Sequence, residues 1–132
     1  MQVMPTTASG VAKQQGIKKH TTDRLVADAK HNVEIGSAYL ADLVNRFGGS
    51  YVLAIAAYNA GPGRVNGWLK DFGDPRADGT DVIDWIETMP IYETRNYVQR
   101  VLENVHLYRN RLGAPPSRMT KDLGRGSAPN NG

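Results

Sequence analysis

The sequence contains no cysteine, and aromatic residues make up only 8% of it. Without thiols there is no disulfide framework, and cysteine usage says nothing about the redox compartment. No apolar run is long enough to cross a membrane, and no secretory signal peptide is present. The net charge of +3 comes from scattered lysines and arginines, without a basic patch or a nucleic-acid recognition motif. Nucleic-acid binding is therefore not expected, although a mildly basic surface suits an anionic polymer.

Metal ligands are also sparse. His20, His31 and His106 are far apart in the sequence and lack the paired spacing of a metal site, so they are predicted to be surface or half-buried residues. Five aspartates lie between positions 71 and 84, but they lack the ordered spacing and the glutamate of an EF-hand loop. We predict no metal ion and no cofactor.

The residues that are present predict one all-α domain. A chain of 132 residues with 40% hydrophobic content can bury a sizeable core. Apolar residues recur at helical spacing, the turns carry glycine or proline, and no strand-like alternation appears. Helices are predicted over residues 7–15, from about 24 or 28 to 46, and over 50–59, 64–72, 81–88 and 93–111. Tyr97, Val101, Val105 and Tyr108 are expected to form the apolar stripe of the last helix. Residues 113–132 contain few large apolar groups and are predicted to be a disordered tail.

The most informative run is Ala57-Tyr58-Asn59-Ala60-Gly61-Pro62-Gly63. Ser50 is a suitable N-cap for the apolar helix before it, and Gly61 is placed to end that helix. Tyr58 and Asn59 then fall in the last turn, directly after an almost wholly apolar segment. Such groups either face a cleft or are buried and satisfied by neighbouring backbone groups, and the run alone leaves both interpretations open.

Two further segments carry polar signals. Gln2 and Met4 precede Pro5 and a pair of threonines that can cap the next helix. Glu93 and Tyr97 are four residues apart at the start of the last helix, so they share one face of it. Each of these residues also has an ordinary explanation: methionine fills core gaps, a carboxylate suits a helix N-terminus, and tyrosine packs in cores.

Taken in order, these segments resemble the lytic transglycosylase catalytic domain, a goose-type-lysozyme-like module that cleaves bacterial peptidoglycan. The matching motifs are Met1-Gln-x-Met-Pro5, Asn32-x-x-x-Gly-x-x-Tyr-Leu40, Arg46-Phe-Gly-Gly49, Ala57-Tyr-Asn-Ala-Gly-Pro-Gly63 and Glu93-Thr-Arg-x-Tyr-Val98. The resemblance covers residues 1–112, implies a lysozyme-like fold, and places the protein in the periplasm or cell envelope. The run from Arg118 to Gly126 also resembles the C-terminal end of the soluble periplasmic members.

The resemblance implies a specific reaction on peptidoglycan glycan strands. Most glycosidases use two carboxylates, whereas this family uses one glutamate as acid and base. The 6-hydroxyl of N-acetylmuramic acid attacks its own anomeric carbon, which breaks the MurNAc-GlcNAc β-1,4 bond without water and leaves a 1,6-anhydro sugar. Tyr58 is implied to support the acid. The implied substrate-binding residues are Gln2, Met4, Tyr39, Tyr58, Asn59, Glu93 and Tyr97.

The family's glutamate stands in a Glu-Ser pair a short way before a Gly-Leu-Met-Gln motif, and this sequence begins inside that motif at Met1. None of its four glutamates, Glu34, Glu87, Glu93 and Glu103, matches that position. We therefore expect the acid upstream of Met1, no activity from residues 1–132 alone, and an uncovered apolar face over residues 54–57. A non-catalytic peptidoglycan-binding module and a hydrolytic goose-type-lysozyme relative remain alternatives. A monomer without nucleic-acid partners is predicted.

Overall fold

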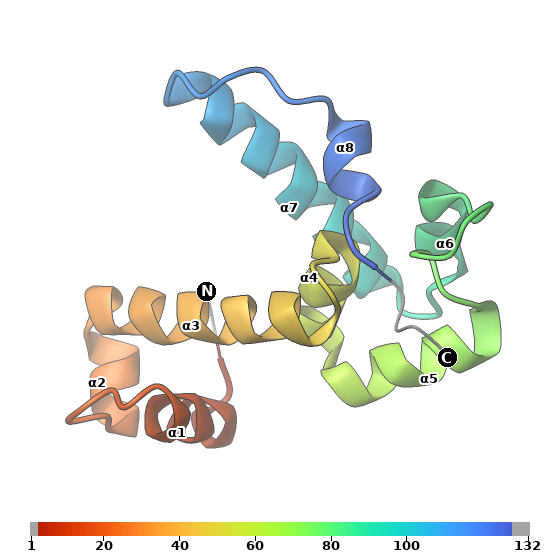
Figure 1. Ribbon diagram of the computed structural model, residues 1–132. Coiled ribbons are helices and arrows are strands. Elements are labelled where there is room, and N and C mark those ends of the chain that lie inside the picture. Colours follow the sequence, from red (N-terminus) through yellow and green to blue (C-terminus); the bar gives the residue numbers. More distant parts are fainter. Residues whose placement is uncertain (1–2, 128–132) are drawn as a thin grey trace. The chain divides into compact units, whose positions relative to one another are not determined.

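A computed structural model describes residues 3–127, and within them every regular element is a helix (Figure 1). The all-α prediction is confirmed. None of the helices in this range is long and apolar enough to span a membrane. By its internal contacts, the chain divides into two compact units, Met1–Asp42 and Leu43–Gly132.

The first unit has its own small core. Helix α1 (Pro5–Gln14) begins with proline at its first position, where the missing N–H costs nothing. Helix α2 (Thr22–Ala27) contacts α1, and α3 (Ala29–Arg46) follows it. The core residues come from all three helices, and they are Ala8, Val11, Ala12, Leu25 and Ile35.

The long helix predicted from about residue 24 or 28 is in fact two helices. Thr21 caps α2 by accepting a hydrogen bond from the Arg24 N–H. The backbone leaves helical geometry at Asp28, which has φ −107° and ψ 102°. The Asp28 carboxylate then accepts the His31 N–H at 3.1 Å, as an N-cap does. The start at residue 28 is thus correct and the start at residue 24 is wrong, because a capping aspartate interrupts the apolar pattern.

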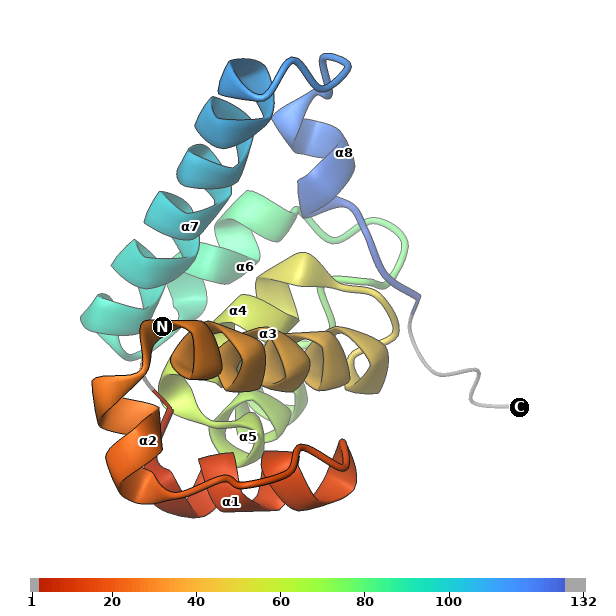
Figure 2. The ribbon, with the colours of Figure 1, turned by 90° about the vertical axis from the view of Figure 1, so that its left-hand side faces the viewer.

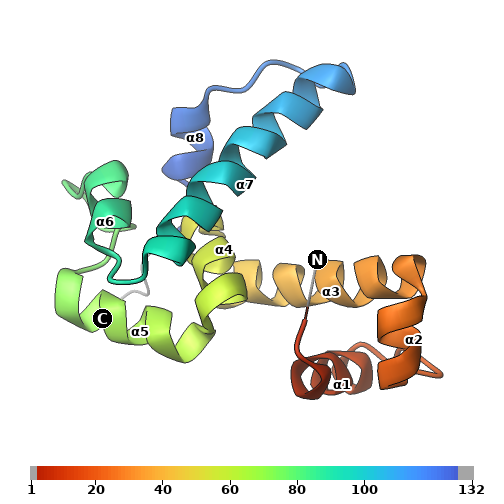
Figure 3. The same cartoon turned by 180° about the vertical axis from the view of Figure 1, so that it is seen from behind.

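The second unit is built around α4 (Tyr51–Ala60). Its ends match the predictions: the Ser50 side chain accepts the Leu53 N–H, and Gly61 ends the helix with φ 94°. Six consecutive residues from Val52 to Ala57 are buried. The expected uncovered face is wrong for Ala54 and Ala57, which have no exposed surface. Figures 1 and 3 show α4 between α5 (Pro62–Phe72) and α7 (Tyr92–Arg111), both of which contact it.

The stripe predicted for α7 is displaced by one residue position. Thr94, Val98 and Leu102 are the buried residues of this helix, whereas Tyr108 is 58% exposed. Between α5 and α7 lies α6 (Val82–Thr88), which is capped by Asp81. Its Trp85 is buried and donates its indole N–H to the Gly73 carbonyl at 2.8 Å, so this tryptophan belongs to the core of the second unit.

The segment predicted as a disordered tail contains α8 (Met119–Leu123). Figures 1 and 2 show α8 returning alongside α7. Asp122 is only 2% exposed, and its carboxylate accepts a hydrogen bond from Arg109 at 2.6 Å. His106 also approaches it, at 3.2 Å. The prediction failed for this part because a charged pair, rather than large apolar side chains, attaches the helix. Residues 128–132 of the predicted tail lie outside the described residues.

Candidate functional site

Tyr58 and Asn59 occupy the last turn of α4, as the sequence predicted. The Tyr58 side chain is half-buried and its hydroxyl oxygen is buried. Asn59 is exposed, in contrast to the six buried residues that precede Tyr58. Gly61 and Pro62 follow at once: Gly61 takes a positive φ that disfavours other residues, and Pro62 begins α5. This sharp junction holds the two polar side chains at the end of a rigid, buried helix.

Glu93 and Tyr97 lie on one face of α7, in its first two turns. Both line a cavity of about 330 Å³ whose other lining residues are Tyr92, Asn96 and Arg100. Burial raises the pKa of the Tyr97 phenol above its ordinary value of 10.0, so its hydroxyl keeps its proton at neutral pH and can donate. The cavity thus combines two aromatic rings with a carboxylate, an amide and a guanidinium.

A side chain that the sequence analysis did not select connects the two segments. Thr94 follows Glu93 directly and is only 1% exposed. Its hydroxyl donates a hydrogen bond to Oδ1 of Asn59 at 2.8 Å, across 35 positions of sequence. The end of α4 and the start of α7 are therefore joined by a direct side-chain hydrogen bond. The available signal was the position of Thr94 inside the motif that supplied Glu93 and Tyr97.

The remaining predicted site residues belong to the first unit. Gln2 lies outside the described residues. Met4 is 72% exposed and stands directly before α1. Tyr39, on α3, is half-buried and packs against the core of its own unit. The roles of these three residues remain predictions.

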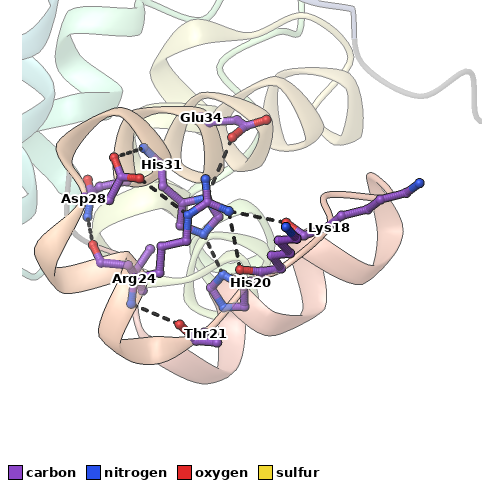
Figure 4. Close-up of polar contacts among 10 residues, drawn as sticks. Lys18, His20, Thr21, Arg24, Asp28, His31 and Glu34 are labelled. Atoms are coloured by element: carbon purple, nitrogen blue, oxygen red, sulfur yellow. Dashed lines mark hydrogen bonds and ion pairs between the residues drawn. The ribbon is translucent and has the colours of Figure 1, made fainter.

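The first unit also contains a polar cluster that the sequence did not predict. His20 and His31 are in direct contact, with Nδ1 of the first 2.9 Å from Nε2 of the second (Figure 4). His31 is 1% exposed, and its Nδ1 lies 3.7 Å from the Glu34 carboxylate. The contact could not be predicted from the sequence, because His20 and His31 are eleven residues apart and meet only through the path of the connector between α1 and α2. Across the described part of the chain, no three histidine, cysteine or acidic side chains are arranged to hold a metal ion.

Comparison with known proteins gives a consistent result. Residues 1–79 match the family described as the transglycosylase SLT domain. The soluble lytic murein transglycosylase of Escherichia coli K12 is 37% identical over 120 residues, which are 91% of this chain and 18% of that protein. Lytic transglycosylase Slt from Pseudomonas aeruginosa, solved as an inactive mutant, is similar with a TM-score of 0.83 and 40% identity over 98% of this chain and 20% of that chain.

A complex of the 70-kDa soluble lytic transglycosylase with bulgecin A is also similar, with a TM-score of 0.81 and 35% identity. That similarity covers 96% of this chain and 20% of the solved chain. The chain thus spans about 18% to 20% of the length of these relatives.

Proposed function

The chain belongs to the transglycosylase SLT domain family, and we propose that it forms part of a peptidoglycan lytic transglycosylase that acts in the periplasm or cell envelope. The proposed reaction is non-hydrolytic cleavage of the MurNAc-GlcNAc β-1,4 bond with formation of a 1,6-anhydro sugar. Its substrate is a glycan strand, which presents hydroxyl, acetamido and carboxylate groups together with apolar ring faces.

One observation carries the proposal. The hydrogen bond from Thr94 to Asn59 joins the two motifs of the second unit, so that the turn with Tyr58 and Asn59 is held against the start of α7, which carries Glu93 and Tyr97. The exposed Asn59 side chain did not need this partner merely to fold, because water can satisfy an amide that reaches solvent. Polar side chains held at the ends of two packed helices suit the recognition of a ligand that is itself rich in hydrogen-bonding groups.

Each of these residues can make a different kind of contact with a glycan. The Tyr97 phenol stays protonated and can donate to an oxygen of the sugar, while its ring offers an apolar face. Glu93 is exposed beside it, and a carboxylate accepts hydrogen bonds from sugar hydroxyls. Tyr58 is assigned to orient the acidic group, as its place in the Ala57-Tyr-Asn-Ala-Gly-Pro-Gly63 motif implies.

The proton donor is proposed to be a glutamate other than the four in this sequence. Glu34, Glu87, Glu93 and Glu103 are followed by isoleucine, threonine, threonine and asparagine, so none stands in the Glu-Ser pair of the family. General acid catalysis commonly contributes a factor of about 10² to 10⁴. Residues 1–132 alone should therefore release no product from peptidoglycan.

The test measures products from purified cell-wall sacculi by mass spectrometry, with the protein as its gene encodes it and with residues 1–132 alone. We expect 1,6-anhydromuropeptides from the first sample only. Reducing muramic acid ends would instead identify a hydrolytic lysozyme relative, and binding without products would identify a non-catalytic module. Products from residues 1–132 would overturn the assignment of the acid.

A matched pair of variants tests the assignment of Tyr58. Replacing Tyr58 with Phe removes one hydroxyl and should lower turnover about 10- to 100-fold, because a hydrogen bond to a charged group is worth about 1.5–3 kcal/mol. The control is Tyr108→Phe, the same change at a tyrosine that is 58% exposed on α7, which should leave turnover unchanged. Equal rates for the two variants would remove Tyr58 from the site.

A further inference from the structure

The least explained polar group in the second unit is the Thr94 hydroxyl. Thr94 is 1% exposed and lies among the buried residues of α7, in a stripe that continues with Val98 and Leu102. A valine would fill nearly the same space without a polar atom. A buried hydroxyl costs free energy unless it is paired, so its presence needs a reason beyond packing.

The hydroxyl makes its hydrogen bond away from its own helix. A threonine inside a helix commonly bonds to a carbonyl three or four residues before it. Thr94 instead donates to Oδ1 of Asn59, which is on the exposed end of α4, at 2.8 Å. One end of this bond is therefore buried and fixed, while the other is a side chain that reaches solvent.

This bond constrains what Asn59 can present. The amide oxygen and the NH₂ group of asparagine lie on opposite sides of one planar group, so holding the oxygen toward α7 directs the NH₂ away from it. We propose that Thr94 is a positioning residue, which holds the Asn59 amide so that its NH₂ group is offered as a donor to the glycan. The inference rests on the proposed function.

The orientation of the Asn59 amide determines which chemical groups of a ligand it can bind. An NH₂ donor requires an acceptor, and a glycan strand offers acetamido carbonyls and carboxylates. A fixed donor also avoids the entropy of ordering a free side chain when the substrate binds. Asn59 in any other orientation would offer its own carbonyl, which carboxylates and acetamido oxygens repel.

Two variants of Thr94 separate positioning from packing. Thr94→Val removes the hydroxyl and keeps the shape, while Thr94→Ser keeps the hydroxyl and removes a methyl group. If Thr94 positions Asn59, the Val variant of the protein as its gene encodes it should lose about 3- to 10-fold in kcat/KM, and the Ser variant should keep nearly all of it. Thermal stability should show the opposite order, because the Ser variant leaves a small cavity and the Val variant does not.

A third variant tests the direction of the amide. Asn59→Asp keeps an oxygen that can accept from Thr94 but replaces the NH₂ donor with a second acceptor. It should lose at least as much activity as Thr94→Val. If Asn59 instead offered its carbonyl to the substrate, the aspartate would retain activity and the proposal would be wrong.

The decisive readout needs no substrate and so separates this inference from the proposed function. Nuclear magnetic resonance of the Asn59 side-chain NH₂ reports how rigidly the amide is held. We expect an ordered amide in the wild-type protein and in Thr94→Ser, and an averaged, mobile one in Thr94→Val. An equally ordered amide in all three proteins overturns the positioning role, whether or not the protein cleaves peptidoglycan. An ordered amide with neither cleavage nor binding of peptidoglycan by the protein as its gene encodes it would overturn the proposed function and the assignment of the glycan as ligand, but leave the Thr94 contact standing.

Discussion

Replacing Asp122 with Asn should weaken the attachment of α8 and lower the stability of the second unit. The Asp122 side chain is 3% exposed, and it faces the guanidinium of Arg109, whose side chain is 32% exposed, and the imidazole of His106, which is 18% exposed. The three side chains connect α8 to the far end of α7. Beyond α8, the Ser127 N–H donates to the Gly48 carbonyl at 3.1 Å, so this attachment extends to the turn before α4.

The expected magnitude follows from this burial. Removing one member of a fully buried ion pair costs about 3–5 kcal/mol, because the other charge is left without compensation. Arg109 is partly exposed, so water can replace part of what it loses, and asparagine keeps one oxygen that can accept. A loss of about 1–3 kcal/mol in the free energy of unfolding is expected. For a unit of this size, that corresponds to a fall of roughly 4–24 °C in the thermal midpoint.

The assay is thermal unfolding followed by circular dichroism for the wild-type protein, Asp122→Asn and a control. The control is Asp71→Asn, the same chemical change at an exposed carboxylate of α5, and it should shift the midpoint by less than about 2 °C. Combining Asp122→Asn with Arg109→Gln should give a coupling energy of about 1 kcal/mol or more. Equal midpoints for the two aspartate variants, or additive effects in the double variant, would refute the pairing.

Two further predictions concern pH. The Arg76 side chain donates to Asp74 at 2.6 Å and lowers the pKa of that carboxyl below 3.8, so the stability that this pair contributes is present above the pKa of the unfolded state and is lost as pH falls through the pKa of the folded state. Acid titration should therefore show a shallower loss of stability below about pH 4 in Asp74→Asn than in the wild type. Parallel curves would contradict this. Burial raises the pKa of Tyr97, so the stabilising contribution of this side chain is lost as pH rises above about 10. Ultraviolet titration should show a tyrosine that ionises at higher pH than the others and that Tyr97→Phe removes. A titration unchanged by this substitution would be inconsistent with the burial of Tyr97.

Local signals in the sequence predicted the local structure well. Ser50 and Gly61 bound α4 as expected, because caps depend on a side chain and the backbone a few residues away. The break between α2 and α3 was harder to place, since Thr21 and Asp28 both offered capping side chains inside one apolar pattern. Helix existence was thus predictable, and the choice between two caps was not.

Long-range polar contacts were not predictable by the same means. The pairing of His20 with His31 depends on how a connector turns, and the bond from Thr94 to Asn59 depends on how two helices pack. Helix α8 was not predicted for a related reason. In the sequence Asp122 is typical of a surface residue, and only the structure shows its hydrogen bond with Arg109. Hydrophobic periodicity reports which face of a helix is buried, but it carries no information about which polar group will be opposite.

The structure of α4 shows why these unpredicted contacts concern the site. A helix with six consecutive buried residues is apolar on all sides, and apolar burial is non-directional, so packing alone fixes its rotation and its position along its axis only weakly. Polar contacts hold both ends of this helix. Before its first turn, the Ser127 N–H binds the Gly48 carbonyl, and Arg76 donates to the Phe47 carbonyl at 3.2 Å.

In its last turn, Asn59 is held by Thr94. The polar contacts that sequence patterns could not predict are therefore the ones that set where the Tyr58 and Asn59 side chains lie. The apolar residues of α4 make the helix stable, whereas the contacts at its two ends fix the position of its last turn.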